Sequence, residues 1–238
     1  MLQQTQVTRV IPKYQAFMER FPTVAACAAA SAGDVVRMWA GLGYNRRAVN
    51  LHRAAVAMGD RVPDTLDELV ALPGIGPYTA RAVLAFAYER DVGVLDVNVI
   101  RSLARLHGRP VTQTEADALV PVGRGWAWNQ AVLDLGATVC TARAPRCDDC
   151  PVAVECVWRA SGGDDPFVAT RQSKFEGSDR QGRGRLVDAL RLGPVTTADV
   201  PSACGWPDDA DRARRIAASL VTDGLAVTTD GALTLPGP

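Results

Sequence analysis

The chain has 238 residues, and its 26 lysine and arginine residues balance 26 aspartate and glutamate residues, so the formal net charge is zero. This length suits one large domain or one domain with a small addition, and the neutral balance excludes a polycationic DNA-coating protein. No apolar run reaches the roughly 18 residues that a membrane span needs, and no signal-peptide pattern follows Met1. We therefore expect a cytoplasmic protein.

Residues 1–160 are predicted to be mostly helical, because their apolar side chains recur at three- and four-residue spacing. The predicted helices cover approximately residues 7–18, 25–39, 46–58, 65–72, 78–88, 98–106, 114–120 and 128–138. Phe21-Pro22-Thr23 ends the first of these, and Gly41-Leu42-Gly43 ends the second. No alternating strand pattern precedes residue 190, so the fold class is mainly α.

Residues 161–180 are rich in Gly, Ser and Asp and are predicted to be a linker. Helices at 184–192, 196–203 and 209–223 follow, and then a β-hairpin that turns at Asp230-Gly231. Three helices and a hairpin predict a small winged-helix-like unit at 181–238. A helical tail without a role in DNA binding fits this pattern equally well.

The stretch 72–80, Leu-Pro-Gly-Ile-Gly-Pro-Tyr-Thr-Ala, joins two predicted helices. Gly74 and Gly76 allow a tight turn and a close approach of the backbone to another group. The N–H groups that begin the next helix are suited to bind an anion, such as a DNA phosphate. Taken alone, this pattern is also that of an ordinary turn between helices.

The stretch 94–101, Val-Leu-Asp-Val-Asn-Val-Ile-Arg, places Asp96 just before a helix, where it could simply be an N-cap. Together with the glycine turn, this stretch resembles the helix-hairpin-helix DNA glycosylases, a base-excision repair superfamily. The resemblance implies a six-helix barrel lobe and an iron–sulfur cluster lobe within residues 1–160. It also implies that Asp96 stabilises the oxocarbenium-like sugar as a flipped base leaves, and that Asn98 helps to hold this site.

Tyr78 stands two positions after the second glycine of the turn. Family members that also nick DNA carry there a lysine that forms a Schiff base. The only lysines of this chain, Lys13 and Lys174, lie outside the motif. We therefore expect a monofunctional glycosylase with Tyr78 at its catalytic site, although Tyr78 could also be a packed aromatic residue.

Four cysteines, Cys140, Cys147, Cys150 and Cys156, follow each other at spacings typical of a metal site. Thiolates are soft ligands that bind Zn²⁺ or iron–sulfur clusters, and the spacing alone does not choose between them. The resemblance to the glycosylases implies a structural [4Fe–4S] cluster held by the loop 140–156. Arg143 and Arg146 lie in this loop, where they could contact DNA phosphates.

The opening Met1-Leu2-Gln3-Gln4-Thr5-Gln6-Val7 and the string Gly41-Leu42-Gly43-Tyr44 resemble the MutY-type adenine DNA glycosylases. Members of this family remove adenine that is mispaired with 8-oxoguanine or guanine. The resemblance implies that Gln4, Thr5, Leu42 and Tyr44 line the lesion side of double-stranded DNA, with Tyr44 as a wedge in the base stack. It further implies a monomer that works on the chromosome, associated with the nucleoid of a prokaryote.

Two features depart from the MutY pattern. The family's catalytic glutamate lies just upstream of the Met-Leu-Gln-Gln string, so we expect either a natural start further upstream or a weakened enzyme. Residues 181–238 are too short and too helical for the Nudix-like domain that reads 8-oxoguanine in many members. A thymine or uracil mismatch glycosylase, a mismatch-binding protein without catalysis and a zinc-stapled helical module remain as alternatives.

Overall fold

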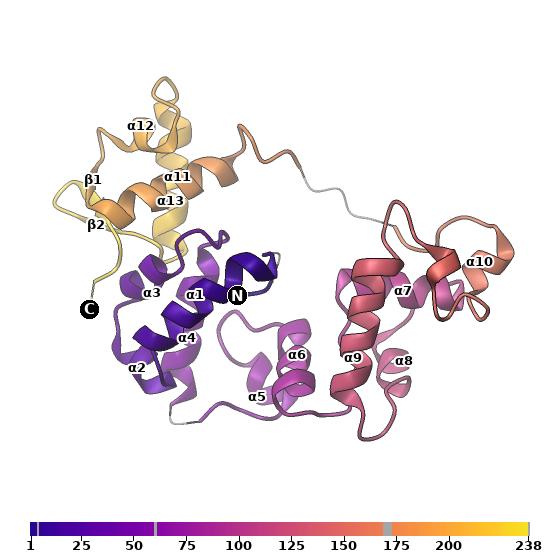
Figure 1. Cartoon of the computed structure of the whole chain (residues 1–238). Coiled ribbons are helices and arrows are strands. Elements are labelled where there is room, and N and C mark those ends of the chain that lie inside the picture. The colour runs from indigo at the N-terminus through magenta and orange to yellow at the C-terminus, as the bar shows by residue number, and fades with distance from the viewer. Residues whose placement is uncertain (4, 60, 169–172, 238) are drawn as a thin grey trace. The chain divides into compact units, whose positions relative to one another are not determined.

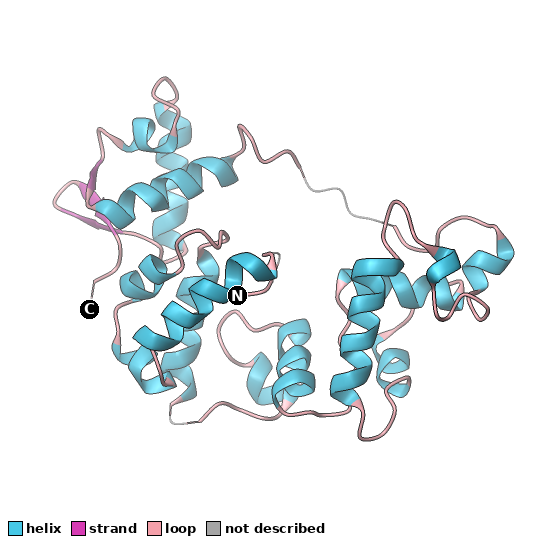
Figure 2. Cartoon of the chain, in the orientation of Figure 1, coloured by secondary structure: helices cyan, strands magenta, loops and turns pink. Residues whose placement is uncertain are grey.

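The computed structural model describes residues 1–3, 5–59, 61–168 and 173–237. These residues form two compact units, both mainly helical (Figure 1). The first unit comprises Met1–Pro63, Leu72–Gly74 and Ser173–Pro238, and the second comprises Asp64–Ala71 and Ile75–Gln172. Within the described residues the strands all lie beyond residue 190, as predicted (Figure 2). None of the described helices is both long and apolar enough to cross a membrane.

The first unit combines N-terminal and C-terminal elements. Its helices are α1 (Val7–Arg20), α2 (Val24–Ala29), α3 (Ala32–Met38), α4 (Arg46–Met58), α11 (Asp179–Leu192), α12 (Val200–Cys204) and α13 (Ala210–Thr222). Its strands are β1 (Val195–Thr196), β2 (Val227–Thr229) and β3 (Ala232–Thr234). The strands form one antiparallel sheet in the order β1-β3-β2.

The C-terminal elements have the predicted winged-helix-like arrangement of three helices and a hairpin, α11, α12, α13, β2 and β3. Strand β1, which the sequence reading did not include, adds a third strand beside β3. The hairpin turns at Asp230 and Gly231, whose φ angles are 50° and 75°. A two-residue hairpin turn of type I′ needs positive φ at both positions, which explains the Asp-Gly pair.

One hydrophobic core holds the first unit together. Val35, Val36 and Trp39 from the N-terminal part share it with Leu186 and Leu190 of α11. Hydrogen bonds also join the N-terminal and C-terminal parts of this unit. The Arg191 Nε–H donates to the Val36 carbonyl at 3.1 Å, and the Gly33 N–H donates to the Pro236 carbonyl at 3.0 Å. The observed grouping therefore differs from the predicted division into 1–160 and 181–238, because the C-terminal segment buries its apolar face against the N-terminal helices.

Two predicted helices of the first unit differ from the structure. The single helix predicted at 25–39 is wrong, because the chain becomes extended at Ala30 and Ser31 then caps a new helix. The Ser31 hydroxyl accepts the N–H of Asp34 at 3.0 Å, as an N-cap should. The helix predicted at 196–203 is also too long, since Thr196 pairs with Ala232 in the sheet and α12 begins only at Val200.

The second unit carries the remaining helices. They are α5 (Leu66–Val70), α6 (Pro77–Ala87), α7 (Val97–His107), α8 (Gln113–Ala118), α9 (Gly125–Asp134) and α10 (Val157–Ser161), with a π-helical turn at Leu135–Val139 and a 3₁₀ turn at Cys147–Asp149. Val99 and Leu103 of α7 pack with Ala116 and Val132 in its core. Buried Asn129 binds the stretch before α7, because its amide oxygen accepts the Val94 N–H at 2.8 Å.

The helix predicted at 128–138 starts earlier in the structure, and its last turn is π-helical rather than α-helical. It begins at Gly125 and turns into a π-helical turn at Leu135–Val139. Gly136 lies in this turn so close to Asn98 that an added Cβ would come within 2.8 Å of the Asn98 backbone oxygen. The predicted linker 161–180 is partly anchored, since Asp165 pairs with buried Arg105 at 2.6 Å and α11 already starts at Asp179.

Candidate active site and cysteine pocket

Asp96 is the N-cap of α7, and its carboxylate is half-buried. Its Oδ1 accepts the Val99 N–H at 2.7 Å, which satisfies one of the donors left open at the start of the helix. Its Oδ2 accepts the side-chain N–H of Asn98 at 3.1 Å. The structural and the functional interpretations of Asp96 are therefore compatible. One oxygen holds the helix, and the other accepts a hydrogen bond from Asn98.

Asn98 connects Asp96 to a buried arginine. The Arg101 Nη2 donates to the Asn98 Oδ1 at 2.9 Å and to the Gly136 carbonyl at 2.6 Å, and its Nε donates to the Cys140 carbonyl at 2.8 Å. Arg101 is only 4% exposed. The guanidinium thus fixes which face Asn98 turns toward Asp96, and it ties the pair to the first cysteine of the cysteine loop.

Tyr78 lies in the first turn of α6 and is 41% exposed. Burial raises the pKa of the Tyr78 hydroxyl, and the negative charge of Asp96 raises it further. Tyr78 therefore stays protonated at neutral pH and is electrostatically coupled to Asp96. The prediction that Tyr78 belongs to the catalytic site rests on its position two residues after Gly76 and stays a prediction.

The two glycines of the turn before α6 behave differently. Gly74 has a φ of +75°, and an added Cβ would lie 2.4 Å from the Asn50 amide nitrogen, so both conformation and space require glycine here. Gly76 is the N-cap of α6 at φ −93°, which any residue can adopt, and nothing lies within 4 Å of its Cβ position. The N-cap residue Gly76 has no side chain that could cap α6, and the N–H groups that begin a helix have the polarity that an anion complements.

The predicted lesion-side residues come together in part in the first unit. The Thr5 hydroxyl donates to the Leu42 carbonyl at 3.2 Å. Tyr44 is 46% exposed, whereas Leu42 is 3% exposed and packs in the core, so only the main chain of Leu42 remains for a ligand. Gln4 lies outside the described residues.

Arg47 organises this region, and sequence reasoning did not single it out. Its guanidinium donates to the carbonyls of Gln3 at 2.5 Å and Leu42 at 3.2 Å and to the Thr5 hydroxyl at 3.3 Å. It also stacks over the Tyr44 ring at 5.4 Å from the centroid. Arg47 therefore joins the N-terminal segment to the loop that presents Tyr44.

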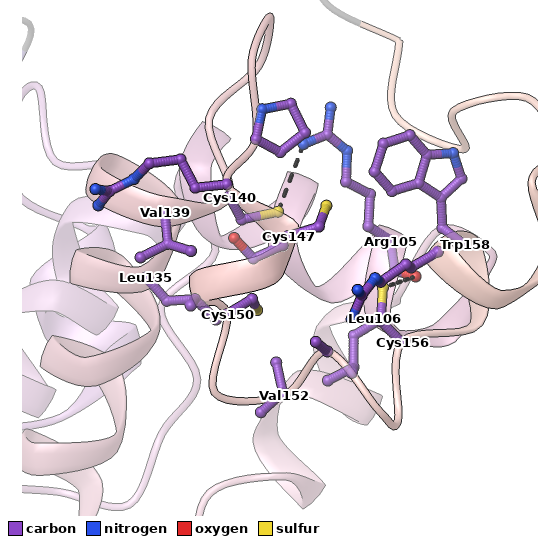
Figure 3. A pocket seen from close by; sticks show the side chains of 15 residues that line it. Arg105, Leu106, Leu135, Val139, Cys140, Cys147, Cys150, Val152, Cys156 and Trp158 are labelled. Carbon is purple, nitrogen blue, oxygen red and sulfur yellow. Dashed lines mark hydrogen bonds between the residues drawn. The ribbon is translucent and has the colours of Figure 1, made fainter.

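The four clustered cysteines line a single pocket with apolar side chains around it (Figure 3). Arg105 forms one wall of the pocket and is only 2% exposed. Its Nη1 lies 3.5 Å from the Cys140 sulfur and donates to the Thr141 carbonyl at 2.8 Å. Its guanidinium also lies over the Trp158 ring, 4.5 Å from the centroid. The side of the pocket at Cys140 is thus positively charged.

These surroundings fit an iron–sulfur cluster. Four soft thiolates, an apolar lining and an adjacent buried cation match the ligands and the environment that such a cluster needs. Among the described residues, no group of three or more His, Cys, Asp or Glu side chains is arranged to hold a single metal ion. Both loop arginines, Arg143 and Arg146, are exposed, and Arg146 also donates to the Thr138 carbonyl at 3.1 Å.

Comparison with known families agrees with both parts of this site. Residues 1–120 match the HhH-GPD superfamily of base excision DNA repair proteins. Residues 140–159 match the iron–sulfur binding domain of endonuclease III. The second match covers all four cysteines of the pocket.

Similar proteins extend this likeness over the whole chain. An adenine DNA glycosylase of Mycolicibacterium smegmatis is 44% identical over 252 residues, covering 100% of this chain and 85% of the relative. An adenine DNA glycosylase of Rattus norvegicus is 40% identical over 171 residues, covering 66% of this chain and 33% of the relative.

Solved structures share the fold. A thermostable thymine-DNA glycosylase superposes with a TM-score of 0.63 at 25% identity, over 67% of this chain and 80% of that one. A trapped endonuclease III–DNA covalent intermediate gives a TM-score of 0.60 at 22% identity, over 68% and 81%. The chain therefore belongs to the HhH-GPD superfamily of base excision DNA repair proteins and carries the iron–sulfur binding domain of the endonuclease III type.

Proposed function

We propose that this protein is a monofunctional adenine DNA glycosylase that hydrolyses the N-glycosidic bond of adenine mispaired with 8-oxoguanine or guanine. Its partner is double-stranded DNA carrying that mispair, and it works as a monomer on chromosomal DNA in the cytoplasm. The whole-chain likeness to adenine DNA glycosylases supports the choice of base. The observation that carries the proposal is the Asp96 carboxylate, half-buried, fixed through one oxygen and paired with Asn98 through the other.

Asp96 supplies negative charge where the reaction develops positive charge. As the adenine leaves, the deoxyribose becomes oxocarbenium-like, and a fixed carboxylate stabilises that cation without having to reorganise. The N-cap bond to Val99 and the amide of Asn98 keep the carboxylate in one orientation. Water then completes the hydrolysis.

Other residues hold the DNA in this proposal. The turn around Gly74 and Gly76 and the first turn of α6 bind a phosphate, while exposed Arg143 contacts the DNA backbone near the cysteine loop. Tyr78 replaces the lysine of the strand-nicking relatives, so no Schiff base forms there. The cysteines Cys140, Cys147, Cys150 and Cys156 hold a [4Fe–4S] cluster whose work is to fix the loop, and no step of the hydrolysis passes through it.

The test is base release under single-turnover conditions from a duplex with adenine opposite 8-oxoguanine, followed by alkaline cleavage of the abasic site. It uses the 238-residue chain and the same chain extended at its N terminus by a segment that carries the family's glutamate. Asp96→Asn keeps an oxygen that can cap α7, but it removes the charge. We expect it to fold normally and to release adenine at least about 100-fold more slowly.

Asp209→Asn is the matched control, because Asp209 is also an N-cap that accepts a backbone N–H, from Arg212 at 3.0 Å. It should leave base release unchanged. Base release by Asp96→Asn at the parent rate would remove Asp96 from the mechanism. A strand nick before alkali, or a covalent adduct trapped by borohydride, would contradict the monofunctional assignment.

The same assay separates the alternatives when adenine, thymine and uracil are each placed opposite guanine or 8-oxoguanine. Release of thymine or uracil but not adenine would identify a mismatch glycosylase of another base specificity, like the thymine-DNA glycosylase whose fold is shared. Tight binding of the mispair without release of any base, even by the extended form, would identify a mismatch-binding protein.

A further inference from the structure

A short segment beyond the cysteine loop returns to helix α7 within the second unit. The Asp165 carboxylate accepts the Arg105 Nη2–H at 2.6 Å, and the Arg105 Nε–H donates to both of its oxygens at 3.2 Å. Two residues later, the Phe167 ring lies against the Arg101 guanidinium, which is 5.7 Å from the ring centroid. Residues 165–167 therefore form a strap over two arginines of α7.

The strap is a turn whose shape its own residues fix. The Phe167 N–H donates to the Asp165 Oδ1 at 3.0 Å, which is the hydrogen bond of an Asx turn. Pro166 between them holds its φ angle and has no N–H that needs a partner. Arg101 and Arg105 are four residues apart on α7, so their side chains leave the same face of the helix. One tight turn can therefore reach both.

Both arginines meet the cysteine pocket at Cys140. The Arg105 Nη1 lies 3.5 Å from the Cys140 sulfur (Figure 3), and the Arg101 Nε donates to the Cys140 carbonyl at 2.8 Å. Arg101 also donates to the side-chain oxygen of Asn98, whose amide donates to Asp96. The strap thus contacts the two side chains that lie between the first cysteine of the pocket and the candidate catalytic carboxylate.

The negative charge of Asp165 balances a buried cation. Arg105 is only 2% exposed, and its oxygen acceptors other than Asp165 are the neutral carbonyls of Thr141 and Ala142, at 2.8 and 3.2 Å. A buried guanidinium without a counter-charge is strongly unfavourable and turns toward water where it can. The Asp165 side chain is itself 32% exposed, so it neutralises Arg105 while it keeps part of its own hydration.

We propose that Asp165 and Phe167 are positioning residues, which keep Arg105 and Arg101 against Cys140 and so secure both the cysteine loop and the candidate catalytic pair. Without the carboxylate, Arg105 turns away from Cys140 and its bonds to the loop carbonyls are lost. Without the ring, water reaches the Arg101 guanidinium and competes with its acceptors. The effect on adenine release rests on the proposed function, whereas the effect on the cysteine loop does not.

The first measurement is cluster retention, in the 238-residue chain and in its N-terminally extended form. It follows the decay of the visible thiolate–iron absorbance after an iron chelator is added in air. Asp165→Asn keeps the shape of the side chain but removes its charge, and it should lose the cluster about tenfold faster than the parent. Phe167→Ala should lose it about threefold faster. Asp165→Glu restores the charge and should stay within about twofold of the parent.

The second measurement is adenine release at single turnover, expressed per cluster-loaded molecule so that cluster loss does not enter the rate. It should fall about three- to tenfold in Asp165→Asn and in Phe167→Ala, because the catalytic pair is less firmly oriented. Asp165→Glu should recover most of the parent rate. Thermal midpoints are recorded for every variant, since a lower midpoint with parent-like retention and release would overturn the positioning role.

A double-mutant cycle tests whether Asp165 acts through Arg105. Arg105→Leu removes the cation, which leaves a charge at position 165 without its partner. Adding Asp165→Asn to Arg105→Leu should therefore change cluster retention by less than about twofold, against about tenfold in the parent. An equal effect in both backgrounds would show that Asp165 works independently of Arg105 and would contradict the inference.

Three control variants change similar groups nearby. Asp164→Asn removes an exposed carboxylate one residue before the strap, and Val168→Ala truncates a side chain that is 87% exposed one residue after it. Asp148→Asn removes a carboxylate of the cysteine loop itself, where Asp148 is 96% exposed and pairs with Arg159 at 3.0 Å. All three should retain the cluster and release adenine almost like the parent.

The outcomes separate this inference from the proposed function. Parent-like retention and release in both Asp165→Asn and Phe167→Ala would overturn the inference while adenine release by the parent stands. Faster cluster loss in these variants, in a protein whose parent form releases no adenine, would support the strap and overturn the proposed function. Equally fast loss in the controls would overturn the inference, because any change near the loop would then have the same effect.

Discussion

Replacing Arg101 by alanine tests whether the buried guanidinium holds the candidate catalytic pair. Arg101 is 4% exposed and donates to three oxygens, the carbonyls of Gly136 and Cys140 and the side-chain oxygen of Asn98. All three lose their donor in Arg101→Ala, and the space of a large side chain remains. A buried acceptor left without a partner costs about 1–3 kcal/mol.

Water entering the vacated space would satisfy part of these groups, so the expected loss is about 3 kcal/mol rather than the sum of three full penalties. For a chain of this length, a change of 1 kcal/mol moves the thermal midpoint by about 2–4 °C. The midpoint of Arg101→Ala should therefore fall by about 6–12 °C. Base release should fall as well, because Asn98 loses the bond that orients its amide toward Asp96.

Thermal unfolding and single-turnover adenine release are measured on the same preparations, with release assayed well below both midpoints and iron content determined for each. Arg109→Ala is the control, since Arg109 lies two residues beyond the end of α7 but is 58% exposed and pairs with Glu115 at the surface. It should melt and react almost like the parent. A midpoint of Arg101→Ala within 2 °C of the parent, with unchanged release, would refute this reasoning.

Three further predictions concern folding. Gly182→Ala should lower stability by about 1–3 kcal/mol in chemical denaturation, because its Cβ would lie 2.0 Å from the Trp206 ring. Ser31→Ala should cost about 1 kcal/mol in the same assay through loss of the N-cap of α3. The third involves Glu115, whose pKa is lowered to about 2 by its hydrogen bond with Arg109 and those with Thr112. Because this pair is exposed, its stabilising effect is small; it should be complete above the ordinary pKa of 4.5 and disappear as the pH falls toward 2, so the stability of Glu115→Gln should vary slightly less than that of the parent across this range.

The local elements were predictable because they depend on near neighbours in the sequence. The helix expected at 46–58 is α4, with the same bounds, because its apolar face repeats without interruption. The Asp-Gly turn of the hairpin is found where the sequence placed it. Errors arose where a single short polar residue, Ser31, starts a new helix inside an Ala-rich run.

Within the candidate site, only the contacts between residues of one sequence motif could be predicted. Asp96 and Asn98 stand in one string, and their contact needs no distant partner. Arg47 and Arg105 were not found, because their acceptors are main-chain carbonyls of loops whose positions no sequence pattern gives. The C-terminal segment was read as a separate unit for the same reason, since only the folded chain brings Leu186 against Val36.

The strong preference for arginine over lysine gains a structural meaning from these contacts. Only Lys13 and Lys174 are lysines among the 26 basic residues, and this bias taken alone indicates a GC-rich coding sequence. Yet Arg101, Arg105 and Arg47 each bind three or more oxygen acceptors that belong to separate stretches of chain. A planar guanidinium with five fixed donors can join several carbonyls at once, whereas an ammonium group is a point charge that is more strongly hydrated and costlier to bury. The arginines at these positions would therefore be selected for geometry whatever the coding bias, and lysine there should fail even though it keeps the charge.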